Sequence, residues 1–251
     1  LNIKKILYLR SDIPSLPVAR NLGVLNISKN SKIICFIDDD VTIYKNYFEK
    51  IIEVFNKNAD ALGVSAYQKQ DRMGLSKKVE NFVKRLFFVE NLKKDSARVL
   101  SAYGAEYPLK LKKIINSQWL TGFNMFYKKE IFKDFRFDEN LTGYALGEDF
   151  DFSYRLIKRY PNSLFITPFA RIKHRASKIE RYPTKKITYM NQINHFYFNF
   201  KNFQSLKELT KFVLCLYGIS LFRIVNFLIK RKRINFLKLL FFFRSVIFCI
   251  L

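Results

Sequence analysis

Ile34-Cys35-Phe36-Ile37-Asp38-Asp39-Asp40 is an apolar segment that ends abruptly in three consecutive carboxylates. Residues 32–37 are too few and too apolar for an exposed helix, so they predict a buried strand. Three adjacent carboxylates raise one another's pKa unless they face open water or hold a divalent cation. The stretch therefore predicts either a solvated acidic turn or a metal site at a strand end.

The flanking segments alternate between helix and strand. Residues 45–57 carry apolar side chains at helical spacing, which predicts an amphipathic helix, and 61–67 form a second apolar strand. This order is typical of a doubly wound α/β sheet. Ligands of such sheets gather at the carboxyl ends of the strands, where Asp38–Asp40 fall.

Further elements are expected on both sides. Residues 3–9 alternate weakly, as in a short strand, and Pro17 is well placed to begin a helix that runs towards Ser28. A helix is predicted over 76–92, followed by a long loop over 93–116.

Next, 118–127 read as an aromatic strand with Gly122 at a point of close approach, and 129–134 as a short helix. A second acidic group, Gly147-Glu148-Asp149-Phe150-Asp151, opens another helix. Acidic residues in a first turn also suit the helix dipole, which is an alternative reason for their presence.

The chain is strongly basic: among 251 residues there are 45 Lys and Arg against 21 Asp and Glu, for a net charge of +24. Scarce acidic residues gathered in two groups favour a hard metal ion and an anionic substrate such as a phosphate ester. The basic residues are spread along the whole length, without a zinc-finger spacing or an RNA-binding aromatic signature. We therefore expect no nucleic-acid partner.

The cysteines and the first residue indicate the compartment. Cys35, Cys215 and Cys249 are odd in number and lie in apolar runs without metal-ligand spacing, as expected for reduced thiols of a cytosolic protein. The chain begins at Leu1 and nothing near it resembles a signal peptide. We expect this start to be a truncation.

The last part of the chain changes character. We expect a catalytic domain over 1–180 and a helical region over 181–251, with helices at 183–202 and 206–229, a basic tetrad at 230–233 and an apolar run at 234–251. Three interpretations stay open: interfacial or re-entrant helices, a transmembrane hairpin, or a helical subdomain or homo-oligomer contact. A basic turn between apolar segments favours a cytoplasmic location at the inner face of a membrane.

The two acidic groups together suit transfer from a nucleotide-sugar. A divalent metal can neutralise a departing pyrophosphate, and a separate carboxylate can take the proton of an attacking hydroxyl. The residues alone predict only metal-assisted transfer involving a phosphorylated substrate.

The chain also resembles the family-2 glycosyltransferases, which have the GT-A fold. Five stretches match in the family's order within residues 15–175: Val18–Gly23, Phe36–Val41, Trp119–Met125, Phe137–Glu139 and Gly147–Arg155. The resemblance implies a mixed α/β sheet flanked by helices and an inverting transfer that needs Mg²⁺ or Mn²⁺. The implied substrates are a nucleotide-sugar donor and a glycan or lipid-linked acceptor.

The resemblance also implies roles for the carboxylates. Asp40 matches the metal ligand of the Asp-x-Asp motif, with Asp38 or Asp39 near the ribose or the metal. Asp149 matches the catalytic base, and Glu148 the acceptor pocket.

Other matching positions surround the donor. Arg20 and Asn21 match a helix start beside the nucleotide, while His174 falls where some members supply a further metal or pyrophosphate ligand. His174 can equally be an ordinary strand-end histidine. Arg175 is expected to meet phosphate.

Trp119 and Gly122 match residues that line a sugar, although Trp119 can also be a core aromatic. Two departures stand out: the family's first βαβ portion, which binds the base, is expected to be missing, and no Gln-x-x-Arg-Trp sequence of processive synthases occurs. The alternatives are a nucleotidyltransferase, although no Gly-rich phosphate loop is seen, and a non-catalytic scaffold.

Overall fold

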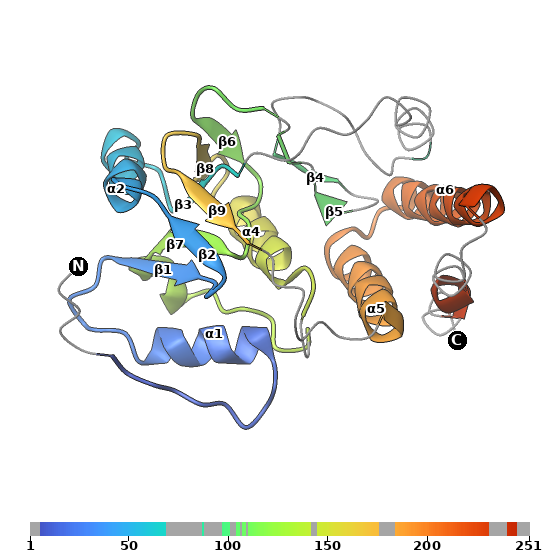
Figure 1. The fold of residues 1–251 in the computed structure, drawn as a ribbon, viewed down its shortest axis with the longest axis horizontal. Helices are drawn as coiled ribbons and strands as arrows, with labels where there is room; N and C mark the ends of the chain where they lie inside the picture. The colour runs from blue at the N-terminus through green and yellow to red at the C-terminus, as the bar shows by residue number, and fades with distance from the viewer. Residues whose placement is uncertain are drawn as a thin grey trace.

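The computed structural model describes residues 6–68, 87, 97–100, 104–105, 107–108, 110–141, 145–175, 184–230 and 240–244 (Figure 1). The helix predicted over 76–92 lies outside these residues apart from position 87, and so do residues 231–233 of the basic tetrad. The principal helices are α1 (Leu16–Leu25), α2 (Tyr47–Lys57), the 3-10 helix η1 (Lys129–Lys133), α4 (Glu148–Arg159), α5 (Thr184–Asn202) and α6 (Leu206–Lys230).

The centre is a five-stranded mixed sheet in the order β1-β7-β3-β8-β6. Its strands are β1 (Ile33–Ile37), β3 (Gly63–Ala66), β6 (Ile115–Ser117), β7 (Asn124–Lys128) and β8 (Leu164–Thr167). β3 and β8 are parallel, whereas β7 is antiparallel to both of its neighbours and β6 to β8. The fold is thus α/β with a mixed sheet flanked by helices, as the resemblance implies, because β7 enters between β1 and β3 in the opposite direction.

Strand direction determines which residues meet at one edge. β1, β3 and β8 run the same way, so their carboxyl ends lie together, and β7 begins at that edge with Asn124 opposite Ile37. Two pairs of short strands lie outside the main sheet: β2 (Val41–Ile43) with β9 (Ile172–His174), and β4 (Val99–Leu100) with β5 (Gly104–Ala105).

Apolar clusters lie on both faces of the sheet, because side chains alternate along each strand. On β7, Met125 and Tyr127 belong to one apolar cluster, with Phe152 and Leu156 of α4. Phe126 belongs to the other cluster, with the apolar face of α2. The core therefore consists of two layers, and it fixes α2 and α4 on opposite faces of the sheet.

Several sequence expectations need correction. Residues 6–9 form no strand, and the loop expected over 93–116 contains β4, β5 and the start of β6. The aromatic strand is shorter than expected: only Asn124–Lys128 pair with neighbouring strands, whereas 118–123 form a bend and a turn. Because Asn124 donates its backbone N–H to Thr121 O, the chain turns just before β7, and this turn contains Gly122.

The C-terminal helices agree closely with the expected ranges. α5 and α6 lie on the side of the molecule away from α2 (Figure 1). Within the described part of the chain, no helix combines the length and the apolar character that crossing a membrane requires.

Candidate active site

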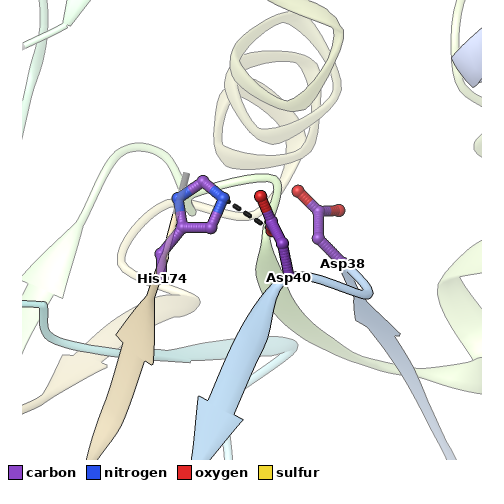
Figure 2. A group of neighbouring side chains, drawn as sticks. All are labelled: Asp38, Asp40 and His174. Atoms are coloured by element: carbon purple, nitrogen blue, oxygen red, sulfur yellow. Dashed lines mark ion pairs between the residues drawn. The ribbon is translucent and has the colours of Figure 1, made fainter. Parts of the chain in front are cut away.

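Two carboxylates and a histidine meet where β1 ends. Asp38 follows β1, Asp40 precedes β2, and His174 ends β9 (Figure 2). Because Val41 of β2 pairs with His174, the imidazole lies beside Asp40, with 2.8 Å between Nε2 and Oδ1. The backbone N–H of Arg175 donates to Asp40 O at 2.9 Å, which anchors the same corner.

This group has the composition of a divalent-cation site. One ligand atom from each of Asp38, Asp40 and His174 can be chosen so that all lie within 4.8 Å of one another. Carboxylate oxygens suit Mg²⁺ and Mn²⁺, and imidazole is a common metal ligand. Burial raises the pKa of Asp38 despite the nearby Arg20 and His174, and the neighbouring carboxylates raise it further. A bound cation would favour the ionised form of Asp38. The three residues therefore fit the Mg²⁺ or Mn²⁺ ion that the sequence predicts.

The neighbouring predicted residues behave differently. Asp39 is exposed and lies outside the group of three. Arg175 is also exposed, and its Nε donates to Thr42 Oγ1 at 3.0 Å. Their roles in binding ribose and phosphate stay predictions.

A second polar cluster lies at the start of α4. The guanidinium of Arg20, on α1, donates to Glu148 through Nη1 and to Gly122 O through Nη2, the latter at 3.1 Å. The backbone N–H of Gly122 donates to Asp149 Oδ2 at 2.7 Å, and that of Phe150 donates to Oδ1 at 2.8 Å. Both oxygens of Asp149 are therefore held by backbone groups, which fixes the orientation of this carboxylate.

The charges of this cluster do not balance when both carboxylates are ionised. Burial raises the pKa of Glu148 from its ordinary value of 4.5 to about 8, and the adjacent Asp149 adds to the shift against the pull of Arg20. Burial likewise raises the pKa of Asp149, although Arg20 and backbone N–H donors, among them those of Phe150 and Gly122, oppose it. One guanidinium balances one carboxylate, so the pair retains one proton in mildly acidic solution.

Asn21 is held by hydrogen bonds and Trp119 by contacts with aromatic rings. Asn21 is buried; its side chain bonds both backbone groups of Phe137 at 2.9 Å and donates to Glu139 at 2.8 Å. The ring of Trp119 meets those of Tyr107 and Phe150 edge to face. Asn21 therefore connects α1 to the segment after η1, and Trp119 belongs to an aromatic wall beside α4.

A single turn joins the two clusters. Gly122 contacts Arg20 and Asp149, while the next residue, Phe123, accepts the backbone N–H of Asp38 at 3.3 Å. The ring of Phe123 also stacks on His174, with 4.8 Å between centroids and 8° between planes. The acidic groups predicted from distant parts of the sequence thus lie on either side of this turn.

Sequence reasoning assigned no role to Phe123, Asp138, Tyr197 or Lys201. Phe123 directly follows Gly122, a predicted site residue, and this adjacency in sequence could have indicated that Phe123 lies at the site. The contacts of Asp138 with the other two residues span about 60 positions, and no local pattern encodes them.

The comparisons with known proteins name the family. The sequence model of glycosyl transferase family 2 matches residues 2–136, just over half of the chain. The chain therefore belongs to glycosyl transferase family 2. That match ends before Glu148 and Asp149, whose roles stay predictions.

Among solved structures, the fold is similar to the crystal structure of GalNAc-T7 with UDP, GalNAc and Mn²⁺. The identity is 14%, the TM-score is 0.47, and the alignment covers 79% of this chain and 40% of that one. The chain thus spans less than half the length of that structure. No curated protein matches the chain by sequence.

The raised pKa of Glu148 predicts how stability depends on pH. The unfolded chain releases this proton near pH 4.5, whereas the folded protein holds it up to about pH 8. Because the folded state binds more protons in this window, the free energy of unfolding is expected to fall as pH rises through it. Urea titrations between pH 5 and 8 should show this fall in the wild type and a flatter dependence in Glu148→Gln. An equal slope in both proteins would contradict the assignment; Glu130→Gln, at an exposed site, is the matched control.

Gly122 offers a test of the turn. A Cβ built there would lie 3.0 Å from Asp149 Oδ2, 3.1 Å from Arg20 Nη2 and 3.3 Å from Glu148 Oε1. All three atoms are side-chain ends that can move by a few tenths of an ångström, so Gly122→Ala should fold. Because small displacements of catalytic groups are costly, we expect sugar transfer to fall by about tenfold, with little change in melting temperature. Gly23→Ala, where a Cβ meets nothing within 4 Å, is the control, and equal activity in both variants would count against a role for the turn.

Proposed function

We propose that this chain is a GT-A-type glycosyltransferase that moves a sugar, with inversion, from a nucleotide-sugar to a hydroxyl acceptor. The observation that carries the proposal is the turn at 121–123, which joins the Asp38, Asp40 and His174 group to the carboxylate pair of α4. A leaving diphosphate and an attacking hydroxyl need different groups, and here these groups share one edge of the sheet.

The donor side consists of the group at the end of β1. Asp40, His174 and Asp38 would hold Mg²⁺ or Mn²⁺, which when bound supplies positive charge against the diphosphate. The stacked ring of Phe123 orients the imidazole, and the hydrogen bond from Arg175 N orients the backbone beside Asp40. These contacts support a preformed site, in which little ordering is needed on binding.

The acceptor side is Asp149. Its two oxygens each accept one backbone N–H, so the remaining lone pairs are available for the proton of an acceptor hydroxyl. Glu148 and Arg20 lie beside it, both buried, and the guanidinium offsets the charge of the pair. A single positioned base fits inversion, in which the acceptor oxygen attacks the anomeric carbon opposite the leaving group.

For the acceptor, we extend the proposal to a lipid-linked or cell-surface glycan, handled at the inner, cytoplasmic face of a membrane. The support is the basic tetrad at 230–233 and the apolar side chains that α6 exposes, among them Val213, Tyr217 and Leu228. A surface contact of this kind needs apolar area and basic charge together.

Calorimetry tests the donor part of the proposal. Titration of the full chain with UDP and with GDP, each with and without Mn²⁺, should show binding of at least one nucleotide that depends on the metal. No binding of either nucleotide in the presence of Mn²⁺ would contradict the proposal. Binding without any transfer would favour the non-catalytic scaffold.

A further inference from the structure

Lys201, near the end of α5, lies between two carboxylates of the catalytic region. Its Nζ donates to Asp138 Oδ2 and lies 2.9 Å from Asp151 Oδ1. The side chain of Asp151 is 1% exposed, that of Asp138 is 11% exposed and that of Lys201 is 26% exposed. One ammonium thus joins the segment after η1 to the first turn of α4, where Asp149 also lies.

Further contacts place the same face of α5 against these elements. Tyr197, one turn earlier, donates to Asp138 Oδ2 at 2.7 Å, and Asn194 donates to Leu146 O at 2.9 Å. The ring of Phe198 lies 4.3 Å from that of Phe150, the residue after Asp149. Residues three to four apart share a helix face, so these contacts form one interface.

The contacts close a ring around the start of α4. Arg20 of α1 pairs with Glu148, and the adjacent Asn21 bonds Phe137 and Glu139, the two neighbours of Asp138. Lys201 pairs with both Asp138 and Asp151, and Asp151 lies in α4. Asp149 therefore lies between two residues of α4 that are tied to different parts of the chain.

Electrostatics indicates that Lys201 is the critical member of the ring. Burial alone would raise the pKa of Asp138, but hydrogen bonds from Lys201 and Tyr197 outweigh it and hold the pKa at about 2. Asp151 also has Arg155 Nε at 2.8 Å. Without Lys201, Asp151 would still have Arg155 as a cationic partner. Asp138 would keep only neutral hydrogen-bond donors, so its charged carboxylate would stay largely buried without a cation to offset the cost of desolvation.

We propose that Lys201 is a positioning residue: by bridging Asp138 and Asp151 it holds the first turn of α4 so that Asp149 faces the acceptor. This inference rests on the proposed function, in which Asp149 is the base. It also makes α5 a part of the catalytic unit.

The test compares Lys201→Met with Lys201→Arg in the full chain, using Lys207→Met at an exposed position of α6 as the control. We expect kcat for transfer to fall by about tenfold in Lys201→Met, because the base is displaced rather than removed, with the donor KM changed less than about twofold. Lys201→Arg, which keeps the charge, should recover most of the rate. A wild-type kcat in Lys201→Met, or a loss that appears only in the donor KM, would overturn the inference.

Hydrogen exchange separates this inference from the proposed function. Amides at 148–153 should exchange faster in Lys201→Met than in the wild type, whereas those of α2 and β3 should not change. Unchanged exchange at the start of α4 would overturn the positioning role, whether or not transfer is detected. A complete absence of transfer in the wild type would instead contradict the proposed function. Should Lys201→Met fail to fold, Asp138→Asn, which keeps the size of the side chain, is subject to the same two readouts.

Discussion

Asp149→Asn is expected to lower the rate of sugar transfer by about 10²–10⁴-fold, the usual contribution of a positioned general base. Asparagine keeps nearly the same shape and one acceptor oxygen, so one of the two backbone N–H groups, those of Gly122 and Phe150, keeps a partner. The amide cannot take the proton of a hydroxyl. Nucleotide binding, which depends on the other side of the turn, should stay within about twofold of wild type.

The measurement is steady-state transfer together with nucleotide titration. Asp60→Asn is the matched control, since Asp60 is exposed and precedes β3 at the opposite edge of the sheet. A wild-type turnover in Asp149→Asn would remove Asp149 from the mechanism.

Asp40→Ala is expected to abolish the metal dependence of nucleotide binding. Loss of groups that merely orient a metal ligand costs roughly 10–100-fold in affinity, so loss of a ligand itself should weaken Mn²⁺ binding by at least about 100-fold. The same substitution leaves His174 Nε2 without the carboxylate that lies 2.8 Å away.

Manganese titration followed by electron paramagnetic resonance checks this directly. His174→Ala should weaken binding in the same direction, and Asp60→Ala should not. If Mn²⁺ binds the Asp40→Ala protein as tightly as the wild type, the ion is held elsewhere.

The positions of the strand-end carboxylates and of the Glu148–Asp149 pair could be predicted because these residues lie in short, ordered motifs. The apolar run before Asp38 and the periodic face of α2 each determine their own element, so their ranges agreed with the structure to within about two residues. The Glu148–Asp149 pair opens α4 as expected, since its acidic first turn and the apolar face of that helix are both local features.

The arrangement of these elements could not be predicted from local pattern. β7 is antiparallel and lies between β1 and β3, a pairing that brings together residues about 90 positions apart. β2 and β9 have three residues each, too few for any periodicity to show. The pairing of these two strands places His174 beside Asp40, so the site itself depends on a contact between segments that carry no signal of their own.

The same holds for the link to the C-terminal helices. The division into a catalytic domain over 1–180 and a helical region over 181–251 stays a prediction, and the contacts across it are not visible in composition. Lys201 and Tyr197 nevertheless bond to Asp138, and one lysine among 45 basic residues carries no mark of that role.

The central claim is that one turn joins a metal-dependent donor site to a single base, and donor turnover tests it most directly. The release of nucleoside diphosphate from a panel of nucleotide-sugars would be measured with the full chain in Mn²⁺, in EDTA, and for Asp149→Asn in Mn²⁺. The account predicts release from at least one donor that stops in EDTA, returns when Mn²⁺ is restored, and falls by at least about 100-fold in Asp149→Asn. Release that continues at the wild-type rate in EDTA or in the Asp149→Asn protein would contradict it.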